Sequence, residues 1–476
     1  MVVIMNIDEK YEKLITFLKE LSKVPRNSKK EERIAEFLCN FAKERNLWYR
    51  KDNFNNVLIK RKASIGYEDR KTIMFQAHTD MVCEKTKDST HNFDTDPIEI
   101  IDEGDILRAK DTTLGADDGI GVAYLLLLLD DKDIKLPAIE CLFTTQEEIG
   151  MNGARAFDYS DINASYLINL DGEEENTAIV GCAGGVSVNY SKVVKQEKCK
   201  GKAYKLEISG LYGGHSGVDI DKGRTNSNLL VALLLEKISD IKIVSFNGGS
   251  KDNAIANRSE IVFLSSLNVK SIIDKNLSGV TFKNEDKNVK INVSILDDTE
   301  YNYISNGESL KFLSLIRGLR QNVIEYSKDI EGLVETSGNI GVVNIQNGKI
   351  SIVESLRSSV DEKRDEIKEY NNNLASSLEY EIKEEGEYPG WKYNKNSKLE
   401  KIYIQAYKKY HNNELPIVCA IHAGVECGMI YEKLPHLDMI SLGPDVKDVH
   451  TVNEKLYLLS CKTLLKTLLE IINNLD

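Results

Sequence analysis

The stretch "TIMFQAHTDM", residues 72–81, joins the fold of this chain to its chemistry. Thr72 to Ala77 is an apolar run of strand-favouring residues, and His78-Thr79-Asp80 follows it directly. We predict a buried strand that delivers a histidine and an aspartate at its carboxyl end. Taken alone, the pair is more simply a capped strand end, with Asp80 accepting loop amide hydrogens and His78 half-buried. The rest of the chain decides between the two interpretations.

The composition is typical of a globular protein with more than one domain. The chain has 476 residues, of which 41% are hydrophobic and 29% charged, and this length exceeds one ordinary core. Its 62 Lys and Arg against 75 Asp and Glu give a formal net charge of -13. Because there is no basic surplus to neutralise phosphates, we expect neither a nucleic-acid partner nor an anionic membrane surface.

Targeting signals and cysteine usage indicate a cytoplasmic protein. The N-terminal apolar run is too short for a signal peptide and lacks a basic flank. The longest apolar run, "VAYLLLLL" at 122–129, is far shorter than the roughly 18–20 residues of a membrane span. The eight cysteines are scattered without a C-x-x-C pair, which in a large chain indicates reduced thiols.

Strands and helices alternate in the first part of the chain. We predict helices near 8–22, 30–45 and 117–130, and strands at 56–62, 72–78, 138–145 and 165–170. This alternation is typical of an α/β sheet with helices on both faces. Such sheets bind ligands outside the carboxyl ends of their strands, which is where the His78 and Asp80 pair would lie.

The sequence pattern changes near residue 186 and changes back near 390. Short alternating strands such as "VSVNYSKVV" then mix with polar helices such as "SSVDEKRDEIKEYNNNL", which favours an α+β module. Afterwards the helix and strand pattern returns and ends in a helix that we predict from Asn453. We therefore predict a catalytic domain in two segments, 1–185 and 390–476, with an inserted domain at 186–389.

Four further segments place acids or histidine beside predicted elements. They are "LGADDGIG" with Asp117 and Asp118, "TTQEEIGMNGA" with Glu147 and Glu148, "LINLDGEE" with Asp171, and "DVHTVNEKL" with His450. Each segment alone is more simply a helix cap, a solvated turn or a loop histidine. Together they supply two histidines and at least three carboxylates at loop edges, a set that suits two zinc-like ions sharing one carboxylate.

Several common catalytic motifs do not occur in the sequence. H-E-x-x-H, G-x-S-x-G, Walker A and G-x-G-x-x-G are all missing. Their absence argues against a thermolysin-type zinc site, a serine hydrolase, an NTPase and a dinucleotide-dependent enzyme.

The motifs and their order resemble the di-zinc exopeptidase superfamily of aminoacylases, carboxypeptidase G and carnosine dipeptidases. Within it, "ISGLYGGHSGVDI", "GCAGG", "HAGVECG" and "SLGPDVKDVHTVNE" are similar to the cytosolic aminoacyl-histidine, or Xaa-His, dipeptidases. The resemblance runs from about residue 8 to the C-terminus. The chain departs from the pattern at Asp118, where Asn is frequent, and at Ala256 and Val452, where Pro is usual.

The resemblance implies a role for each candidate residue. His78 and Asp171 would bind one metal ion, Glu148 and His450 the other, and Asp117, followed by a cis peptide, would bridge them. Asp80 would orient His78, Glu147 would be the general base, and His215 would stabilise the oxyanion. Asn253, Arg357 and Gly424 would bind the substrate, with Arg357 suited to its free carboxylate. For His215 an ordinary loop histidine is the alternative, and for Asn253 and Arg357 a solvated polar surface.

The function implied is that of a metal-dependent dipeptidase acting on small unblocked dipeptides, carnosine-like and other Xaa-His peptides among them. A water bridging two divalent ions would attack the peptide bond, with Zn²⁺ expected first and Co²⁺ or Mn²⁺ as alternatives. A related amidohydrolase acting on N-acyl amino acids or tripeptides is the second hypothesis, and a non-catalytic binding protein the third. The resemblance further implies a homodimer, formed through the inserted domain, in which His215 serves the neighbouring subunit.

Overall fold

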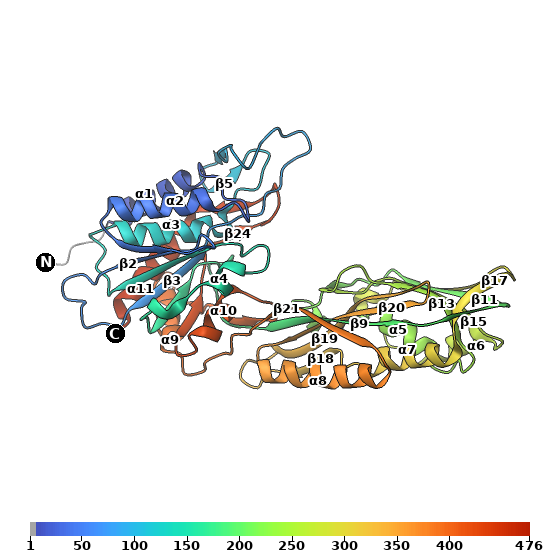
Figure 1. The fold of residues 1–476 in the computed structure, drawn as a ribbon. Coiled ribbons are helices and arrows are strands. Elements are labelled where there is room, and N and C mark those ends of the chain that lie inside the picture. The colour runs from blue at the N-terminus through green and yellow to red at the C-terminus, as the bar shows by residue number, and fades with distance from the viewer. Residues whose placement is uncertain (1–5) are drawn as a thin grey trace. The chain divides into compact units, whose positions relative to one another are not determined.

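The computed structural model describes residues 6–476, which fold as two compact units. The first unit contains the chain up to Cys182 together with Trp391–Ala420 and Val425–Asp476. The second contains Ala183–Gly390 and the short return Ile421–Gly424. Each unit is built on its own large β-sheet (Figure 1).

The first unit has an eight-stranded mixed sheet. Its elements are α1 (Ile7–Leu21), α2 (Glu32–Glu44), β1 (Trp48–Lys51), β2 (Val57–Arg61), β3 (Ile73–His78), β4 (Ile100–Asp102), β5 (Ile106–Ala109), α3 (Ala116–Asp130), β6 (Ile139–Thr144), α4 (Asn152–Ala156), β7 (Tyr166–Asn169), β8 (Thr177–Cys182), α9 (Lys398–Tyr410), β22 (Ile417–Ile421), α10 (Glu426–Lys433), β23 (Asp438–Ser441), β24 (Val446–Lys447), β25 (Lys455–Tyr457) and α11 (Leu458–Asn474). The strand order is β1-β2-β6-β3-β7-β23-β8-β22. Helices α1, α2 and α3 cover one face, and α4 and α10 cover the other (Figure 1).

The centre of this sheet is parallel and fully buried. Strand β3 pairs in parallel with β6 and β7, and all six of its residues are buried. Because helices cover both faces, the strand reads as a continuous apolar run without alternation. Helix α3 is also apolar around its whole circumference, and Val122 to Leu129 are at most 4% exposed. The apolar run of the sequence is thus a core helix.

Parallel pairing brings three loops to one edge of the sheet. The carboxyl ends of β3, β6 and β7 lie at the same edge, and each is followed by acidic or histidine side chains. This arrangement confirms the predicted α/β class with a mixed sheet flanked by helices.

The predicted start of the final helix at Asn453 is wrong. Helix α11 begins at Leu458, and Lys455–Tyr457 form the short strand β25 instead. Leu456 pairs with Leu107 of β5 and is fully buried, so sheet pairing takes these residues before the helix can begin. His450 therefore lies in the loop between β24 and β25.

The second unit has a nine-stranded antiparallel sheet. Its elements are β9 (Gly184–Val193), β10 (Gln196–Lys200), β11 (Ala203–Ser209), β12 (Gly214–His215), α5 (Ser227–Leu234), β13 (Lys242–Gly248), β14 (Ala254–Ile255), β15 (Ser259–Leu264), α6 (Val269–Leu277), β16 (Lys290–Ile295), β17 (Glu300–Ile304), α7 (Asn306–Gly318), β18 (Asn322–Tyr326), β19 (Val334–Gln346), β20 (Lys349–Ser358), α8 (Asp361–Ser377) and β21 (Glu381–Tyr388). The main path runs β16-β11-β15-β13-β19-β20-β9-β21. Helices α5 to α8 cover one face of it (Figure 1). Burial alternates along strands such as β11, as expected when one face is packed and the other open.

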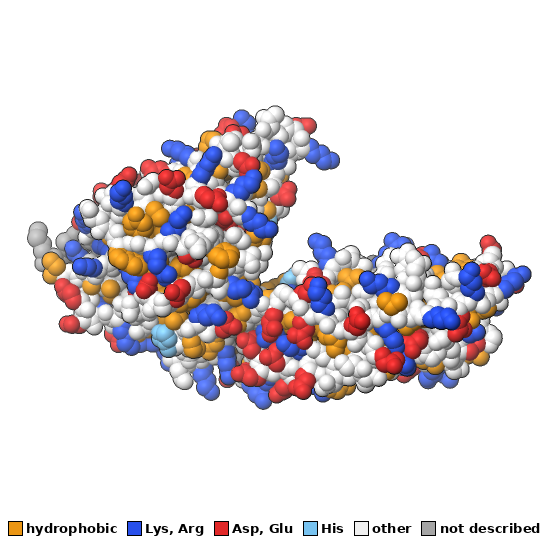
Figure 2. Space-filling view, viewed as in Figure 1, with side chains coloured by type: hydrophobic (Ala, Val, Ile, Leu, Met, Phe, Trp, Pro, Cys, Tyr) orange, Lys and Arg blue, Asp and Glu red, His pale blue; other side chains and the backbone are white. Residues whose placement is uncertain are grey.

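Charged side chains of both signs cover the visible face of each unit (Figure 2). Acidic side chains gather over α8 and β21, where Lys368 pairs with Asp365 and Glu384. Within residues 6–476, none of the helices has the length and apolar character needed to cross a membrane.

Candidate metal and catalytic site

His78 ends strand β3, and its two ring nitrogens have different partners. Nδ1 lies 3.1 Å from the backbone carbonyl oxygen of Asp80, which can only accept a hydrogen bond. Nδ1 is therefore the donor there, and Nε2 is the nitrogen left to bind a cation. Nε2 lies 3.0 Å from Oδ1 of Asp117 and 3.4 Å from Oδ1 of Asp171. The ring is 1% exposed, so packing fixes its orientation.

Asp117 lies between the two candidate histidines. Its Oδ1 faces His78, and its Oδ2 lies 3.1 Å from Nε2 of His450. The same nitrogen of His450 lies 3.0 Å from Oε2 of Glu148. Asp117 stands at the start of α3 with a non-helical backbone, and the peptide bond to Asp118 is cis, as predicted. The five candidate ligands thus form two groups that share one carboxylate.

The donor set fits a divalent cation. Ligand atoms of His78, Asp117 and Glu148 lie within 4.8 Å of one another. Oε1 of Glu148 is buried and has no hydrogen-bond partner, which is costly unless another group binds it. Imidazole nitrogens with carboxylate oxygens are the ligands that zinc and similar ions take in proteins.

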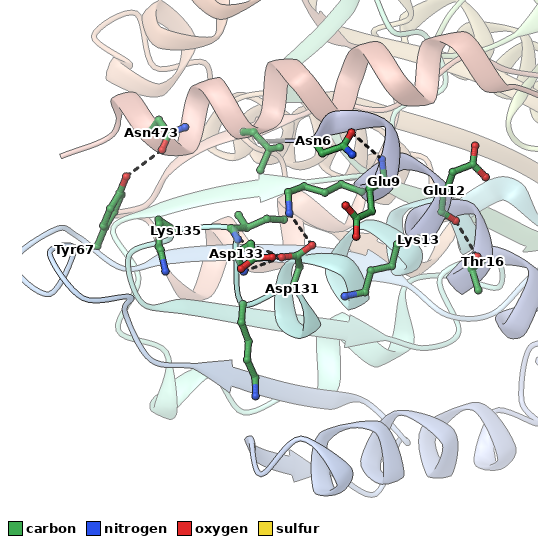
Figure 3. Close-up of a pocket in the computed structure, with 14 residues that line it drawn as sticks. Asn6, Glu9, Glu12, Lys13, Thr16, Tyr67, Asp131, Asp133, Lys135 and Asn473 are labelled. Atoms are coloured by element: carbon green, nitrogen blue, oxygen red, sulfur yellow. Dashed lines mark hydrogen bonds and ion pairs between the residues drawn. The ribbon is translucent and has the colours of Figure 1, made fainter. Parts of the chain in front are cut away.

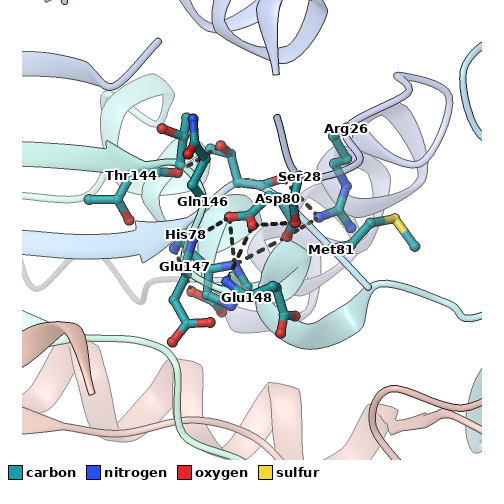
Figure 4. Close-up of polar contacts among 12 residues, drawn as sticks. Arg26, Ser28, His78, Asp80, Met81, Thr144, Gln146, Glu147 and Glu148 are labelled. Atoms are coloured by element: carbon teal, nitrogen blue, oxygen red, sulfur yellow. Dashed lines mark hydrogen bonds and ion pairs between the residues drawn. The ribbon is translucent and has the colours of Figure 1, made fainter. Parts of the chain in front are cut away.

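Asp80 holds the loop that follows β6 (Figure 4). Its carboxylate accepts the backbone N–H groups of Glu147 at 3.0 Å and Glu148 at 3.3 Å, and the Ser28 hydroxyl at 2.8 Å. Its Oδ1 lies 3.6 Å from Nδ1 of His78, beyond a good hydrogen bond, so the Asp80 carbonyl does the orienting. The Asp80 carboxylate therefore accepts loop amide hydrogens, as in the simpler interpretation of the sequence, and its backbone carbonyl contacts His78.

Burial and neighbouring charged groups shift the pKa values of the acidic residues at the site. Burial raises the pKa of Asp171 to about 6 and the pKa of Glu147 well above its ordinary value. Burial acts on Asp117 as well, but hydrogen bonds from His450 and His78 outweigh it and lower that pKa. The raised pKa of Glu147 favours a carboxyl that can hold a proton, which suits a general base that later acts as an acid.

Asp118 is the position where the resemblance expects Asn. The side chain is 1% exposed and accepts backbone N–H groups of His78 and Gly121, each at 3.1 Å. Burial, reinforced by the charge of Asp171, raises the pKa of Asp118 well above its ordinary value. Oδ2 accepts the N–H of His78 and Oδ1 that of Gly121, whereas an asparagine at this position has one acceptor oxygen and could keep only one of these contacts in the same geometry.

A buried polar network lies beneath the candidate ligands, and sequence reasoning missed it. Glu426, at the start of α10, is fully buried and accepts from Gln76 Nε2 at 2.6 Å and Thr144 Oγ1 at 2.7 Å. Asn169 donates to Gln76 at 2.6 Å and accepts from Ser441 at 2.5 Å. The network joins the ends of four neighbouring strands, β6, β3, β7 and β23. A polar residue inside an apolar strand, such as Gln76, was the available signal.

His215 lies in the second unit, on the short strand β12. Its Nδ1 accepts two backbone N–H groups, from Gly217 at 3.1 Å and Val218 at 3.2 Å. The proton of the neutral ring is therefore on Nε2. Burial, followed by the charge of Arg357, lowers the pKa of His215 and favours this neutral form. His215 is thus a fixed hydrogen-bond donor.

The proposed substrate residues also belong to the second unit. Arg357 is 7% exposed and donates from Nη1 to the Tyr388 hydroxyl at 2.7 Å, while its Nε has no partner. A Cβ on Gly424 would come within 2.6 Å of the Tyr388 ring, so glycine is required there. Asn253 is exposed, and its backbone carbonyl accepts the N–H of Ser216. Arg357 is thus buried, where a solvated surface was the alternative.

A pocket of roughly 1200 Å³ in the first unit contains none of the predicted site residues (Figure 3). Its walls come from α1, the loop after α3, the Tyr67 loop and α11. Lys10 and Asp131 form a buried ion pair of 2.9 Å on one wall. Acids and lysines alternate around it, so it offers no convergent set of ligands.

Comparison with known proteins identifies the family. The sequence profile of Peptidase family M20/M25/M40 matches residues 74–474. The chain belongs to this family. The match begins inside β3 and ends with α11, so it includes every candidate metal ligand. It confirms the resemblance seen in the motifs.

Two relatives match this chain over nearly their whole length. The cytosol non-specific dipeptidase of Escherichia coli K12 is 33% identical over 453 residues, or 92% of each chain. The crystal structure of an aminoacylhistidine dipeptidase from Vibrio alginolyticus superposes with a TM-score of 0.93 at 31% identity, covering 97% of this chain and 96% of that one. A tripeptidase from Staphylococcus aureus shares the fold, with a TM-score of 0.55 at 16% identity.

Proposed function

We propose that this M20 chain is a metal-dependent dipeptidase that hydrolyses small unblocked dipeptides, those with a C-terminal histidine among them. The division of the Asp117 carboxylate between two histidine–carboxylate groups, with Glu147 next in sequence to the ligand Glu148, carries the proposal. Similarity to two dipeptidases supports the substrate class. One of these relatives is a non-specific dipeptidase and the other an aminoacylhistidine dipeptidase, so the proposal does not require a C-terminal histidine.

The proposed ligands would hold two divalent cations, with zinc expected first and cobalt or manganese as alternatives. His78 and Asp171 would hold one, Glu148 and His450 the other, and Asp117 would serve both. When bound, the cations supply Lewis acidity, which makes water more acidic and polarises a peptide carbonyl.

Glu147 would take a proton from the attacking water and return it to the departing amine. Its pKa is raised by burial and by the neighbouring acids Asp171, Glu426 and Glu148, which favours holding that proton between the two transfers. Asp80 supports this role because it fixes the backbone of Glu147 and Glu148 together. The backbone positions of the proposed base Glu147 and the proposed ligand Glu148 are therefore fixed relative to each other.

The second unit would act as the lid and dimerisation domain. His215, with its proton on Nε2, would donate to the oxyanion that forms during hydrolysis. Arg357, Asn253 and Gly424 would bind the substrate, with the free Nε of Arg357 available to its carboxylate. We expect a cytoplasmic homodimer in which each His215 serves the other subunit.

A substrate panel tests the proposal. Purified chain loaded with Zn²⁺, Mn²⁺ or Co²⁺ should cleave Ala-His and β-Ala-His and leave N-acetyl-His intact, because a dipeptidase recognises a free amino terminus. Cleavage of N-acetyl-His alone, or of tripeptides alone, would assign the related amidohydrolase or tripeptidase activity. Metal analysis well below two ions per chain, with no hydrolysis of any compound, would reject catalysis.

A further inference from the structure

Glu454 is a buried carboxylate that binds backbone rather than side chains. It is 2% exposed and lies one residue before β25. Oε2 accepts the N–H groups of Leu114 at 2.8 Å and Gly115 at 3.0 Å. Oε1 accepts those of Ala116 at 2.7 Å and Asp117 at 3.3 Å. One side chain thus holds four consecutive amides that end at Asp117.

Arg26 binds the carbonyl groups of the same region (Figure 4). It is 2% exposed, and Nη1 donates to the carbonyl oxygens of Thr79 at 3.1 Å and Asp80 at 3.3 Å. Its Nη2 donates to the carbonyl oxygen of Gly115. Arg26 therefore ties the turn after His78 to the segment before Asp117.

Gly115 is held at both of its backbone groups. Its N–H binds Glu454 and its carbonyl binds Arg26. Its φ of 69° is left-handed, and a Cβ there would lie 2.5 Å from Nη2 of Arg26 and 2.8 Å from Sδ of Met81. Only glycine fits between the two charged groups.

We propose that Arg26 and Glu454 are positioning residues that set the place of the Asp117 carboxylate relative to His78. The inference rests on the proposed function in one respect only, that Asp117 is a metal ligand. Neither residue touches the candidate ligand atoms, and both act through the main chain that carries them.

Charge explains why two ionised groups occupy this buried place. A buried guanidinium or carboxylate alone is costly, but here Arg26 donates to three carbonyl oxygens and Glu454 accepts four backbone N–H groups, and each of these contacts is a charge-assisted hydrogen bond. Burial lowers the pKa of Arg26, and the nearby charge of Glu454 is the main opposing effect. The segment that carries Asp117 is thereby held in place before any cation binds. Residues behind metal ligands generally have this orienting role.

Asp131, which Figure 3 labels, pairs with Lys10 and offers a matched control. Asp131 is 8% exposed, and its Oδ1 accepts the backbone N–H groups of Asp133 at 2.9 Å and Ile134 at 3.3 Å. Lys10, 6% exposed, supplies the buried cation. Asp131 therefore shares with Glu454 a buried carboxylate that accepts backbone N–H groups, on a loop that carries no candidate ligand.

The test titrates metal-free full-length chain with Co²⁺, whose visible spectrum reports ligand geometry. Glu454→Gln should weaken Co²⁺ binding about 10–100-fold and change the spectrum, because the amide points a donor at two N–H groups. Arg26→Lys keeps the positive charge but loses the several N–H donors of the guanidinium group. It should also weaken Co²⁺ binding and change the spectrum, but by less. Asp131→Asn should bind Co²⁺ as wild type does, even if its melting temperature falls.

The outcomes separate this inference from the proposed function. Wild-type Co²⁺ affinity and spectrum in folded Glu454→Gln and Arg26→Lys would overturn the inference, as would equal losses in Asp131→Asn. If Glu454→Gln does not fold, Arg26→Lys alone decides. A wild-type chain that binds Co²⁺ but cleaves no dipeptide would refute the function and leave the metal readout valid. A chain that binds no Co²⁺ would overturn both.

Discussion

Glu147 and Glu148 are neighbours in sequence, yet their side chains point in different directions (Figure 4). Gln146, just before them, has a left-handed backbone with a φ of 55°, which turns the chain sharply after β6. Glu148 then reaches His450, while Asp80 holds the backbone N–H of both residues. This geometry allows one acid to bind metal and the other to move a proton.

Replacing Glu147 with Gln should separate these two tasks. The amide keeps the size of the side chain but cannot take a proton, so kcat on Ala-His should fall by on the order of 10² to 10⁴. Metal content should stay at the wild-type level, because Glu148 and the other proposed ligands are untouched. Steady-state kinetics and elemental analysis of the same preparation check both parts, and turnover close to wild type would move the base elsewhere.

His450 has a φ of 62° and a side chain that is 48% exposed, which is unusual for a purely structural histidine. His450→Ala should remove one proposed metal ligand and abolish dipeptide hydrolysis while the fold persists. His436→Ala is the matched control, because His436 is also exposed but lies between α10 and β23, outside the segments that carry the candidate ligands. Equal metal content and activity in both variants would exclude His450 from the site.

At the scale of elements, the sequence predicts what depends on local pattern. Strand β3, predicted at 72–78, runs from Ile73 to His78, and the acids after β6 and β7 meet it because parallel strands share an edge. The helix predicted from Asn453 failed because Leu456 pairs with Leu107, about 350 positions away. Local pattern carries no information on such pairing.

The supporting groups of the site escaped prediction for the same reason. Glu454 and Arg26 bind main-chain groups, which every residue has, so no motif reveals their partners. Glu426 reaches Gln76 across a sequence separation of 350 residues. Histidines and carboxylates at strand ends indicate a set of metal ligands. The residues that hold those ligands in place cannot be told from other charged residues in the sequence.

Glu354 gives an element-scale prediction for the second unit. It lies on β20, is fully buried, and accepts from Tyr190 of β9 at 3.0 Å and Asn371 of α8 at 3.0 Å. Burial raises its pKa from 4.5 to about 7, against the effect of both hydrogen bonds. The folded chain therefore holds this proton more tightly than the unfolded chain, and stability is lost as pH rises from about 4.5 to 7.

Glu354→Gln should remove that loss, because an amide does not titrate. Between about pH 5 and pH 8, the opening free energy of β9 and β20 amides should fall by roughly 3 kcal/mol more in wild type than in the variant. Hydrogen exchange followed by mass spectrometry, corrected for intrinsic rates, measures this, with β3 of the first unit as the internal reference. Parallel pH dependence in the two proteins would mean that Glu354 is not protonated in the fold.

At the scale of the whole molecule, the proposed machinery is divided between the two units. The candidate metal ligands and Glu147 belong to the first unit, and His215 with the proposed substrate residues belongs to the second. The main chain crosses between the units at Cys182, Trp391 and the short return Ile421–Gly424. The proposed mechanism would therefore draw on residues of both units, which can come from one chain or from two.

Mixing two inactive variants distinguishes these possibilities. We expect His215→Ala and Glu147→Gln each to be nearly inactive alone, since one lacks the oxyanion donor and the other the base. In a two-fold dimer with exchanged lids, the Glu147 of the first variant meets the intact His215 of the second, while the other site carries both defects. Denaturing and refolding the two chains together, with separate tags, should therefore restore one working site in each mixed dimer.

Recovered activity should follow the amount of heterodimer isolated by both tags and reach about half the wild-type rate per dimer, because one of its two sites works. As a control, each variant is denatured and refolded alone by the same procedure, which measures any activity that refolding itself restores. If His215 instead serves its own chain, every site in the mixture has one defect, and isolated heterodimers stay as inactive as the parents. That result, or a chain that sediments as a monomer while hydrolysing dipeptides, would reject the shared site and leave lid closure within one chain.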